Sequence, residues 1–271
     1  MRVYEELVLG AAAGSAQGVF EWLPVSSKTI LLLIFYWAGL QPSTAYLLGL
    51  FLNGSTAAAA IIYFRKDVLM ILRGVVGDVE GLRLLKFLLA STAATGFIAP
   101  PLALTIAEHL ERLDKLSMLA IGILYLIMSI LLWMGGKPAD TNNSNDLRPY
   151  RDGLLAGLAQ GLSALPGISR SGITIVALLM LGKSPSTALR LSFLMSIPAT
   201  LGGSAYTLLL NRGVTASISA ATLITAAATA ITTSLIAITV LLRVSKKLKP
   251  HALTLTLAAI TLIAALIQAQ L

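Results

Sequence analysis

The sequence predicts an all-α polytopic membrane protein with six transmembrane helices and two re-entrant helical hairpins in an inverted repeat. Its apolar composition, its long uncharged stretches and an internal repeat support this fold class. Of the 271 residues, 56% are hydrophobic and only 12% are charged, and the mean hydropathy is +0.85. Soluble proteins keep roughly a quarter of their residues charged, so this composition excludes a soluble enzyme, a DNA-binding domain, a secreted disulfide scaffold and a disordered chain.

The charge balance and the lack of cysteine narrow the function further. The formal net charge is +8, from 20 Lys and Arg against 12 Asp and Glu. Membrane proteins concentrate Lys and Arg in cytoplasmic loops, so the excess requires no nucleic-acid partner. The chain contains no cysteine, which excludes disulfide bonds and thiolate metal sites.

Six stretches are almost free of charged side chains and long enough to cross a bilayer. A helix needs about 20 apolar residues to span the hydrocarbon. These stretches predict transmembrane helices over residues 44–64, 86–107, 116–136, 189–211, 216–242 and 250–271.

Two further apolar segments, residues 5–36 and 153–182, contain Gly, Pro, Ser and several charges. Such segments make poor lipid-facing helices. Broken backbone at membrane depth is tolerated where it is buried in protein or lines a cavity. We therefore predict that both segments are re-entrant hairpins.

The distribution of basic residues predicts the orientation. The connections 65–86, 137–151 and 243–249 are rich in Lys and Arg, whereas residues 37–43 carry none and residues 108–115 carry two among three acids. Basic loops stay in the cytoplasm, so both termini are predicted on the outer face. The first hairpin then enters from outside, where the site opens, and the second enters from inside.

An internal repeat supports the same arrangement. Residues 16–25 read AQGVFEWLPV and residues 159–168 read AQGLSALPGI, and serines follow both copies. Three crossings follow each copy, and because this number is odd the second copy is inverted in the membrane. The chain thus divides into a first repeat (1–136), a cytoplasmic linker (137–152) and a second, inverted repeat (153–271). Transporters of this design build their site near the bilayer midplane.

Ionisable groups inside a membrane are costly, so the charged residues of the hairpins are functional candidates. Glu21 lies one helical turn after Gln17, which places both side chains on one face. Carboxylate and carboxamide oxygens, completed by water and phosphate oxygens, suit Mg²⁺ or Ca²⁺, so this pair is the predicted metal site. Two alternatives remain: Glu21 can act as a general base, or the pair can satisfy backbone donors at a broken helix.

The run from Pro166 to Thr174, PGISRSGIT, predicts an anion-binding loop. Glycine lets the backbone approach a ligand, and the helix expected to begin near Ser171 directs its first amides toward an anion. Arg170 adds a planar fork matched to phosphate oxygens. The other predicted substrate-binding residues here are Ser169, Ser171, Gly172 and Thr174. Their three hydroxyls can donate to an anion or, alternatively, cap the helix.

The turn of the first hairpin mirrors this loop. Ser27 is a candidate nucleophile, and Ser26 and Lys28 beside it are predicted to bind substrate. The two histidines of the chain lie outside the hairpins, so the base that activates Ser27 is Glu21 or the cation that it binds. Water activated by the same carboxylate is equally consistent.

These motifs resemble those of the undecaprenyl-diphosphatase family, integral membrane enzymes also linked to bacitracin resistance. Gln17 and Glu21 match its first motif, and PGISRSGIT matches its second, which is highly specific. The similarity spans nearly the whole chain. It implies removal of the terminal phosphate of a polyprenyl diphosphate, with a divalent cation, in a site open to the outer face. The catalytic roles fall on Glu21, Ser27 and Arg170.

The chain departs from the family at one place. Where the family commonly has Ser-Ser-Thr-Gly-His, this sequence has Ser26-Ser27-Lys28-Thr29-Ile30. The family's histidine, a proposed catalytic group, is thus replaced by Ile30. Either the histidine is dispensable, or Lys28 supplies the missing positive charge, or the substrate differs. We expect Lys28 to supply it, because the hairpin holds no other cation.

The predicted function is therefore a membrane-embedded phosphatase that acts on an undecaprenyl-type diphosphate and recycles the glycan carrier lipid. The alternative is a transporter or flippase of a phospholipid or anionic substrate, since the architecture is a transporter design and transport does not need the missing histidine. A purely structural role leaves the costly Arg and Glu unexplained. Membrane lipids are expected partners. Small residues at Ala57–Ala60 and Ala226–Ala230 permit close packing within the chain or in a homodimer.

Overall fold

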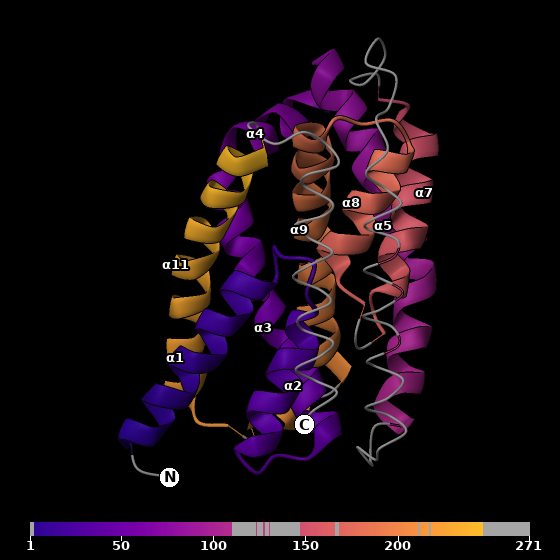
Figure 1. Cartoon of the computed structure of the whole chain (residues 1–271). Helices are drawn as coiled ribbons and strands as arrows, with labels where there is room; N and C mark the ends of the chain where they lie inside the picture. The colour runs from indigo at the N-terminus through magenta and orange to yellow at the C-terminus, as the bar shows by residue number, and fades with distance from the viewer. Residues whose placement is uncertain are drawn as a thin grey trace.

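The computed structural model describes residues 3–109, 123, 127, 130, 147–165, 168–210, 212–216 and 218–245. Over these residues the chain is all-helical and contains no strand, and the long helices run side by side along one axis (Figure 1). Nearly all of the predicted span 116–136, the span 250–271 and most of the linker 137–152 lie outside the described residues.

The helices follow in the order α1 (Val3–Phe20), α2 (Ser27–Trp37), α3 (Pro42–Tyr63), α4 (Arg65–Gly74), α5 (Val79–His109), α7 (Pro149–Leu162), α8 (Arg170–Met180), α9 (Pro185–Leu210), α10 (Arg212–Ala216) and α11 (Ala220–Ser245). Within the described residues, three stretches are long and apolar enough to cross a membrane: Pro42–Tyr63, Val79–Thr105 and Ala220–Ser245. The all-helical class and the membrane character are thus confirmed.

The basic stretch 65–86, expected as a connecting loop, is instead mostly helical. α4 fills its first part and buries Ile71. α5 begins at Val79, well before the predicted boundary, because Asp78 Oδ1 accepts a hydrogen bond of 3.1 Å from the backbone N–H of Glu80 and so caps the helix. Charge alone located this segment at a membrane face, but its helical structure depends on apolar periodicity and capping.

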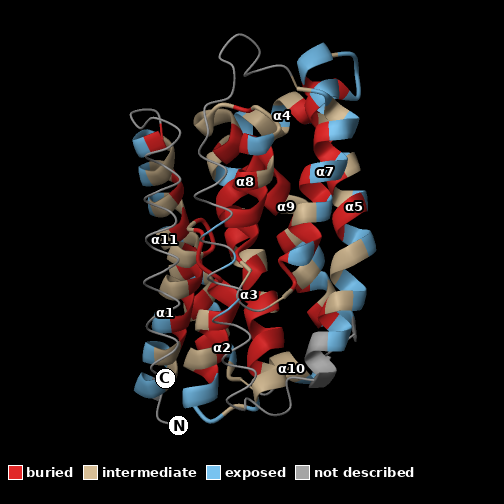
Figure 2. Cartoon of the chain, turned by 45° about the vertical axis from the view of Figure 1, so that its right-hand side comes forward, coloured by how far each residue is buried: buried red, intermediate tan, exposed pale blue. Residues whose placement is uncertain are grey.

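Two pairs of helices turn back at mid-height (Figure 1). α1 and α2, joined by residues 21–26, extend from one end of the molecule. α7 and α8, joined by residues 163–169, extend from the opposite end. The two turns, which we call the hairpin tips, meet at the centre, where buried residues are concentrated (Figure 2).

Both hairpins end in the same type of turn. Gly39 and Gly182 have positive φ angles of 93° and 83°, which glycine adopts without steric cost. The next residue of each turn donates its N–H back into the helix, a common way of ending one. These bonds, each 3.0 Å long, join Leu40 N to Phe35 O and Lys183 N to Leu178 O. Pro-Ser-Thr-Ala then begins both α3 and α9, so the repeat extends beyond the hairpins.

Glycines let the first helix of each hairpin pack closely against a long helix. α1 lies along α11, and α7 lies along α5. Each hairpin helix presents three glycines one turn apart, at positions where an added Cβ would collide with the neighbour. Small residues at this spacing allow membrane helices to approach closely. They are Gly10, Gly14 and Gly18 on α1, and Gly153, Gly157 and Gly161 on α7.

The alanine stretch predicted to pack within or between chains is used within the chain. Ala226 and Ala230 on α11 are fully buried, and their carbonyl oxygens lie where Gly14 and Gly18 of α1 leave room. These two alanines therefore serve the contact between α1 and α11.

Gly157→Ala should lower the thermal stability, because the new methyl group would overlap the backbone of Ser91 on α5. Overpacking a tight interior costs about 1–3 kcal/mol. Thermal unfolding in detergent, followed by circular dichroism, measures the change. Gly213→Ala is the matched control, since no atom of the described residues lies within 4 Å of its added methyl group. Equal melting temperatures for the two variants would contradict the close contact of α7 with α5.

Candidate functional site

The two hairpin tips are tied together through one backbone carbonyl. Leu23 O in the first tip accepts hydrogen bonds from Ser169 Oγ at 3.0 Å and from Ser171 Oγ at 2.6 Å. The tips also pack tightly, because a Cβ on Gly172 would lie 3.1 Å from Pro24 Cβ. These contacts hold the start of α8 against the first hairpin.

Arg170, the first residue of α8, is buried and bonds to the first hairpin and to α9. Its Nε lies 3.3 Å from Glu21 Oε1, forming an ion pair between two buried side chains. Its Nη2 donates to the backbone oxygen of Glu21 at 3.3 Å, and its Nη1 to that of Ser192 at 3.1 Å. The guanidinium also lies 5.6 Å from the centre of the Trp22 ring. Arg170 is thus fixed in position while parts of its fork remain free to donate.

The second carboxylate oxygen of Glu21 faces Ser27. Ser27 Oγ donates to Glu21 Oε2 over 2.6 Å, and Gln17 Nε2 donates to the same oxygen over 3.0 Å. Gln17 Nε2 also lies 2.6 Å from Asn53 Oδ1 on α3. A hydroxyl that donates to a carboxylate at this distance can pass its proton to it, which is the arrangement of a nucleophile with its base.

Lys28 is a buried cation next to this pair, with 8% of its surface exposed. Among the residues that the structure describes, its ammonium makes no hydrogen bond or ion pair. A buried charge that no hydrogen bond satisfies is costly. Its place is therefore better explained by an anionic ligand than by packing.

The remaining hydroxyls of the predicted site bond within the protein. Ser169 Oγ accepts from Gly172 N at 3.2 Å and so caps α8. Thr174 Oγ1 donates to Arg170 O at 2.8 Å and lies 2.6 Å from Ser192 Oγ, and Ser26 Oγ accepts from Thr29 at 3.0 Å. The capping alternative is thus correct for Ser169. The hydroxyls of this group stabilise the backbone around Arg170. Pro166 and Gly167 lie outside the described residues.

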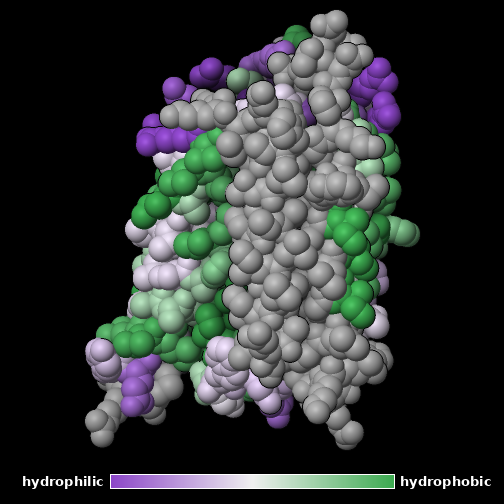
Figure 3. All heavy atoms as spheres, viewed as in Figure 1, coloured by the Kyte–Doolittle hydropathy of each residue, from purple (hydrophilic) through white to green (hydrophobic). Residues whose placement is uncertain are grey.

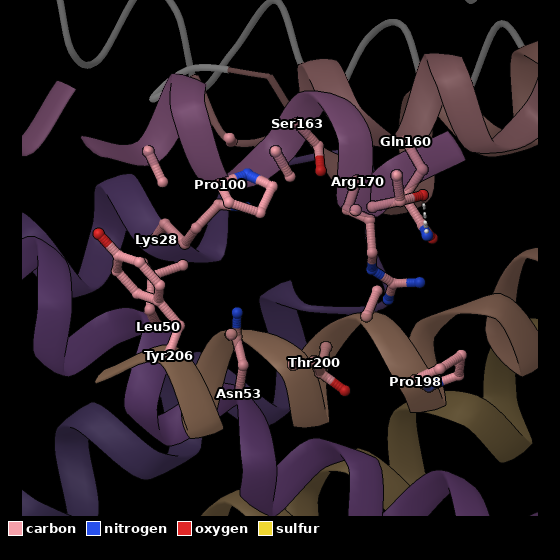
Figure 4. A pocket seen from close by; sticks show the side chains of 18 of the residues that line it. Lys28, Leu50, Asn53, Pro100, Gln160, Ser163, Arg170, Pro198, Thr200 and Tyr206 are labelled. Carbon is pink, nitrogen blue, oxygen red and sulfur yellow. Dashed lines mark hydrogen bonds between the residues drawn. The ribbon is translucent and has the colours of Figure 1, made fainter. Parts of the chain in front are cut away.

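Two pockets meet at the charged residues. A small one is lined by Ser27, Ser26 and Ser169. The other is a larger cavity of about 220 Å³ (Figure 4). Glu21, Lys28 and Arg170 line both. Beyond these charges, the cavity is walled by small and apolar residues of α5 and α9 and by a few polar side chains. The walls include Asn53, Thr95, Gly96, Ala99, Pro100, Gln160, Ala199, Gly202, Gly203 and Tyr206.

The cavity lies where the two halves differ. α3 packs closely along α11, whereas α9 and α5, the pair that the repeat relates to them, contact each other much less. The cavity is lined from both α5 and α9. The departure from symmetry between the halves therefore leaves room for a ligand on one side of the tips.

Some residues of the site were not predicted. Asn53, Gln160 and Ser192 are polar residues within apolar helices, and Tyr46 OH donates to Ala164 O in the second tip at 2.9 Å. Gln160 aligns with Gln17 in the internal repeat, so the repeat could have identified it. Asn53 and Ser192 carried no comparable signal, because they belong to neither hairpin.

The donor set near Glu21 fits a hard divalent cation in part. The described residues contain no group of three or more His, Cys, Asp or Glu side chains that could hold a metal ion. Gln17 Oε1, however, is buried close to a carboxylate and has no hydrogen-bond partner among the described residues. Mg²⁺ is commonly bound by one or two carboxylates, waters and substrate phosphates, so Glu21 and Gln17 fit a cation that a phosphate ligand completes.

The chain is similar to known proteins of one family. Residues 10–263 match the family described as bacitracin resistance protein BacA. An undecaprenyl-diphosphatase of Saccharolobus islandicus (strain M.16.4 / Kamchatka #3) is 41% identical over 76% of this chain and 75% of its own. Proteins of the same name from Pyrobaculum aerophilum and Methanococcoides burtonii are 38% and 39% identical, over 79% and 69% of this chain and 82% and 73% of theirs. None of these names supports the transporter alternative.

Removing Arg170 alone should destabilise the protein more than removing both members of the ion pair. Arg170→Met leaves the Glu21 carboxylate buried without its cation, at a cost of about 3–5 kcal/mol. The double variant Glu21→Gln, Arg170→Met should recover part of this loss. Unfolding of the four proteins in detergent measures the coupling, and strictly additive effects would show that the pair is not coupled.

Proposed function

This chain belongs to the bacitracin resistance protein BacA family, and we propose how its site performs the reaction of that family. It is a multi-pass membrane enzyme, an undecaprenyl-diphosphatase that hydrolyses undecaprenyl diphosphate to the monophosphate carrier lipid. The contact of 2.6 Å between Ser27 Oγ and Glu21 Oε2, beside two buried cations, carries the proposed mechanism.

In the first step Ser27 is the nucleophile. Its Oγ forms a bond to the terminal phosphorus as its proton passes to Glu21, and the bond from phosphorus to the bridging oxygen breaks. The lipid monophosphate leaves, takes up the proton from Glu21, and phosphate remains on Ser27. A positioned base is what a serine needs to act as a nucleophile.

The terminal phosphate lies at the junction of the two pockets, among Glu21, Lys28 and Arg170. The free N–H groups of Arg170 and the ammonium of Lys28 stabilise charge on the transferred phosphoryl and on the leaving phosphate. Phosphoryl transfer depends mainly on such positioning and charge stabilisation. Lys28 thereby supplies the positive charge that the family's histidine would provide.

A divalent cation, Mg²⁺ or Ca²⁺, would be held by Glu21 and the free oxygen of Gln17. When bound, it would neutralise phosphate charge and draw the substrate toward the first tip. The hydroxyls of Ser26, Ser169, Ser171 and Thr174 and the backbone at Gly172 then keep the tips in place around the phosphates.

We assign the end that contains α4 to the cytoplasmic face. Hydrophilic surface gathers at that end (Figure 3), and it includes exposed basic residues, as expected for a cytoplasmic face. Among them are Arg65, Lys66, Arg73, Arg83, Arg148 and Arg243. On this assignment α1 and α2 form the re-entrant hairpin from the outer side, and α7 and α8 form the one from the cytoplasm.

The cavity then lies in the outer half of the membrane. Its lining residues come from the beginning of α3 and from the later parts of α5 and α9, all of which lie away from the cytoplasmic end. Its small apolar residues suit the first units of a prenyl chain, which would leave between the halves into the bilayer. The site is therefore accessible from the outer side.

Ser27→Ala should reduce phosphate release from undecaprenyl diphosphate by at least about 10³-fold, because loss of a covalent nucleophile removes the main reaction path. Purified protein in detergent, assayed with Mg²⁺ or Ca²⁺, gives the rate. Thr207→Val is the control, since Thr207 is a buried threonine on α9 outside the cavity. Activity in Ser27→Ala above about a tenth of that of the unaltered chain would exclude the covalent route.

Lys28→Met should lower kcat/KM by roughly 10- to 100-fold, which corresponds to one lost charge-assisted hydrogen bond. Lys28→Arg, which keeps the charge, should retain more activity than Lys28→Met. Phosphate release over a range of substrate concentrations separates KM from kcat. Unchanged kinetics in Lys28→Met would show that the lysine does not replace the histidine.

A further inference from the structure

Gln160, which lines the larger cavity, carries a buried hydrogen-bond acceptor that no described residue satisfies. Gln160 on α7 is 2% exposed and lines the cavity. Its Nε2 donates to Thr95 Oγ1 on α5 at 2.9 Å, the bond drawn in Figure 4. Its Oε1 is buried and has no hydrogen-bond partner in the part of the chain that the structure describes. Leaving such an oxygen unbonded costs about 1–3 kcal/mol, so the site is built for a ligand that donates a hydrogen.

The surrounding bonds fix which end of the Gln160 amide is free. Thr95 Oγ1 has one hydrogen, which it directs to the carbonyl oxygens of Ser91 at 2.8 Å and Gly157 at 3.0 Å. Thr95 can therefore only accept from Gln160, and the amide nitrogen must face it. The orientation with the oxygen free is thus set by the network.

Gln160 and Gln17 are equivalent in the internal repeat but lie in different settings. Gln17 donates to Glu21, the carboxylate of its own tip. Residues 160–169 contain no carboxylate, and Gln160 instead faces the cavity that Glu21, Lys28 and Arg170 also line. Gln160 therefore belongs to the same site as Gln17 but lines its larger cavity.

The chemistry of the second step determines what this acceptor binds. In an in-line displacement the leaving group departs opposite Ser27, which places the departing lipid phosphate in the larger cavity. The group that later attacks phosphate on Ser27 must approach from that same side. A carbonyl oxygen cannot bond to unprotonated phosphate oxygens, because both only accept. A water molecule can both donate a hydrogen bond to Gln160 Oε1 and attack phosphorus from the side of the larger cavity.

We propose that Gln160 is a positioning residue for the hydrolytic water. This inference rests on the proposed function. One water hydrogen bonds to Gln160 Oε1 and the other to the carboxylate of Glu21. The water oxygen forms a bond to phosphorus as its proton passes to Glu21, and the bond between phosphorus and Ser27 Oγ breaks. Glu21 returns that proton to Ser27, and phosphate is released.

Competition between water and methanol tests this role. Methanol has a single O–H, which Glu21 must accept, so Gln160 favours water over methanol. Gln160→Met removes the acceptor at nearly constant volume. The ratio of methyl phosphate to phosphate, at a fixed methanol concentration, should rise about 10-fold over that of the unaltered chain, the worth of one hydrogen bond of about 1.4 kcal/mol. Total turnover should fall.

Two further variants make the test decisive. Thr95→Val releases the constraint on the Gln160 amide and should shift the ratio in the same direction by a smaller factor. Thr207→Val, which removes a buried threonine hydroxyl outside the cavity, should leave it unchanged. Reduced turnover with an unchanged ratio in Gln160→Met and Thr95→Val would overturn the proposal and leave Gln160 a structural role. If the unaltered chain releases no phosphate, the proposed function itself fails.

Discussion

The ion pair between Arg170 and Glu21 is the constraint on which the rest of the structure depends. Each charge alone would be costly inside a membrane, and the two come from opposite halves of the chain. They can pair only if both hairpins stop at mid-height and turn toward each other. The broken helices, the tight contact of the tips and the placement of Ser27 beside Glu21 all follow from meeting this requirement.

The packing that carries the tips to the centre is nearly symmetric in the part of the chain that the structure describes, and a departure from that symmetry creates the cavity. Glycines on α1 and α7 seat the hairpins against α11 and α5 in the same way. The closer contact of α3 with α11 than of α9 with α5 leaves the cavity on one side only. The repeat thus supplies the framework, while the difference between the copies supplies the space for substrate and water.

The sequence was sufficient to predict the class of fold and the central residues, for identifiable reasons. Glu21, Ser27, Lys28 and Arg170 are conspicuous because charges and serines are rare in apolar segments. It was insufficient for partners that become significant only through folding, such as the carbonyl of Leu23 or Asn53 on α3. The prediction of a loop at residues 65–86 was wrong, because basic residues are typical of a membrane face but do not exclude a helix there.

The hydrogen bonds that join the two tips constrain the sequence on one side more than on the other. Its acceptor is the backbone oxygen of Leu23, which every residue type provides, so that position is free to drift within the limits of packing. Its donors are the side chains of Ser169 and Ser171, and only another hydroxyl of similar reach could replace them. At this join, selection to keep the two halves in register therefore acts on the two serines of the second copy and leaves the Leu23 side chain of the first copy freer to change.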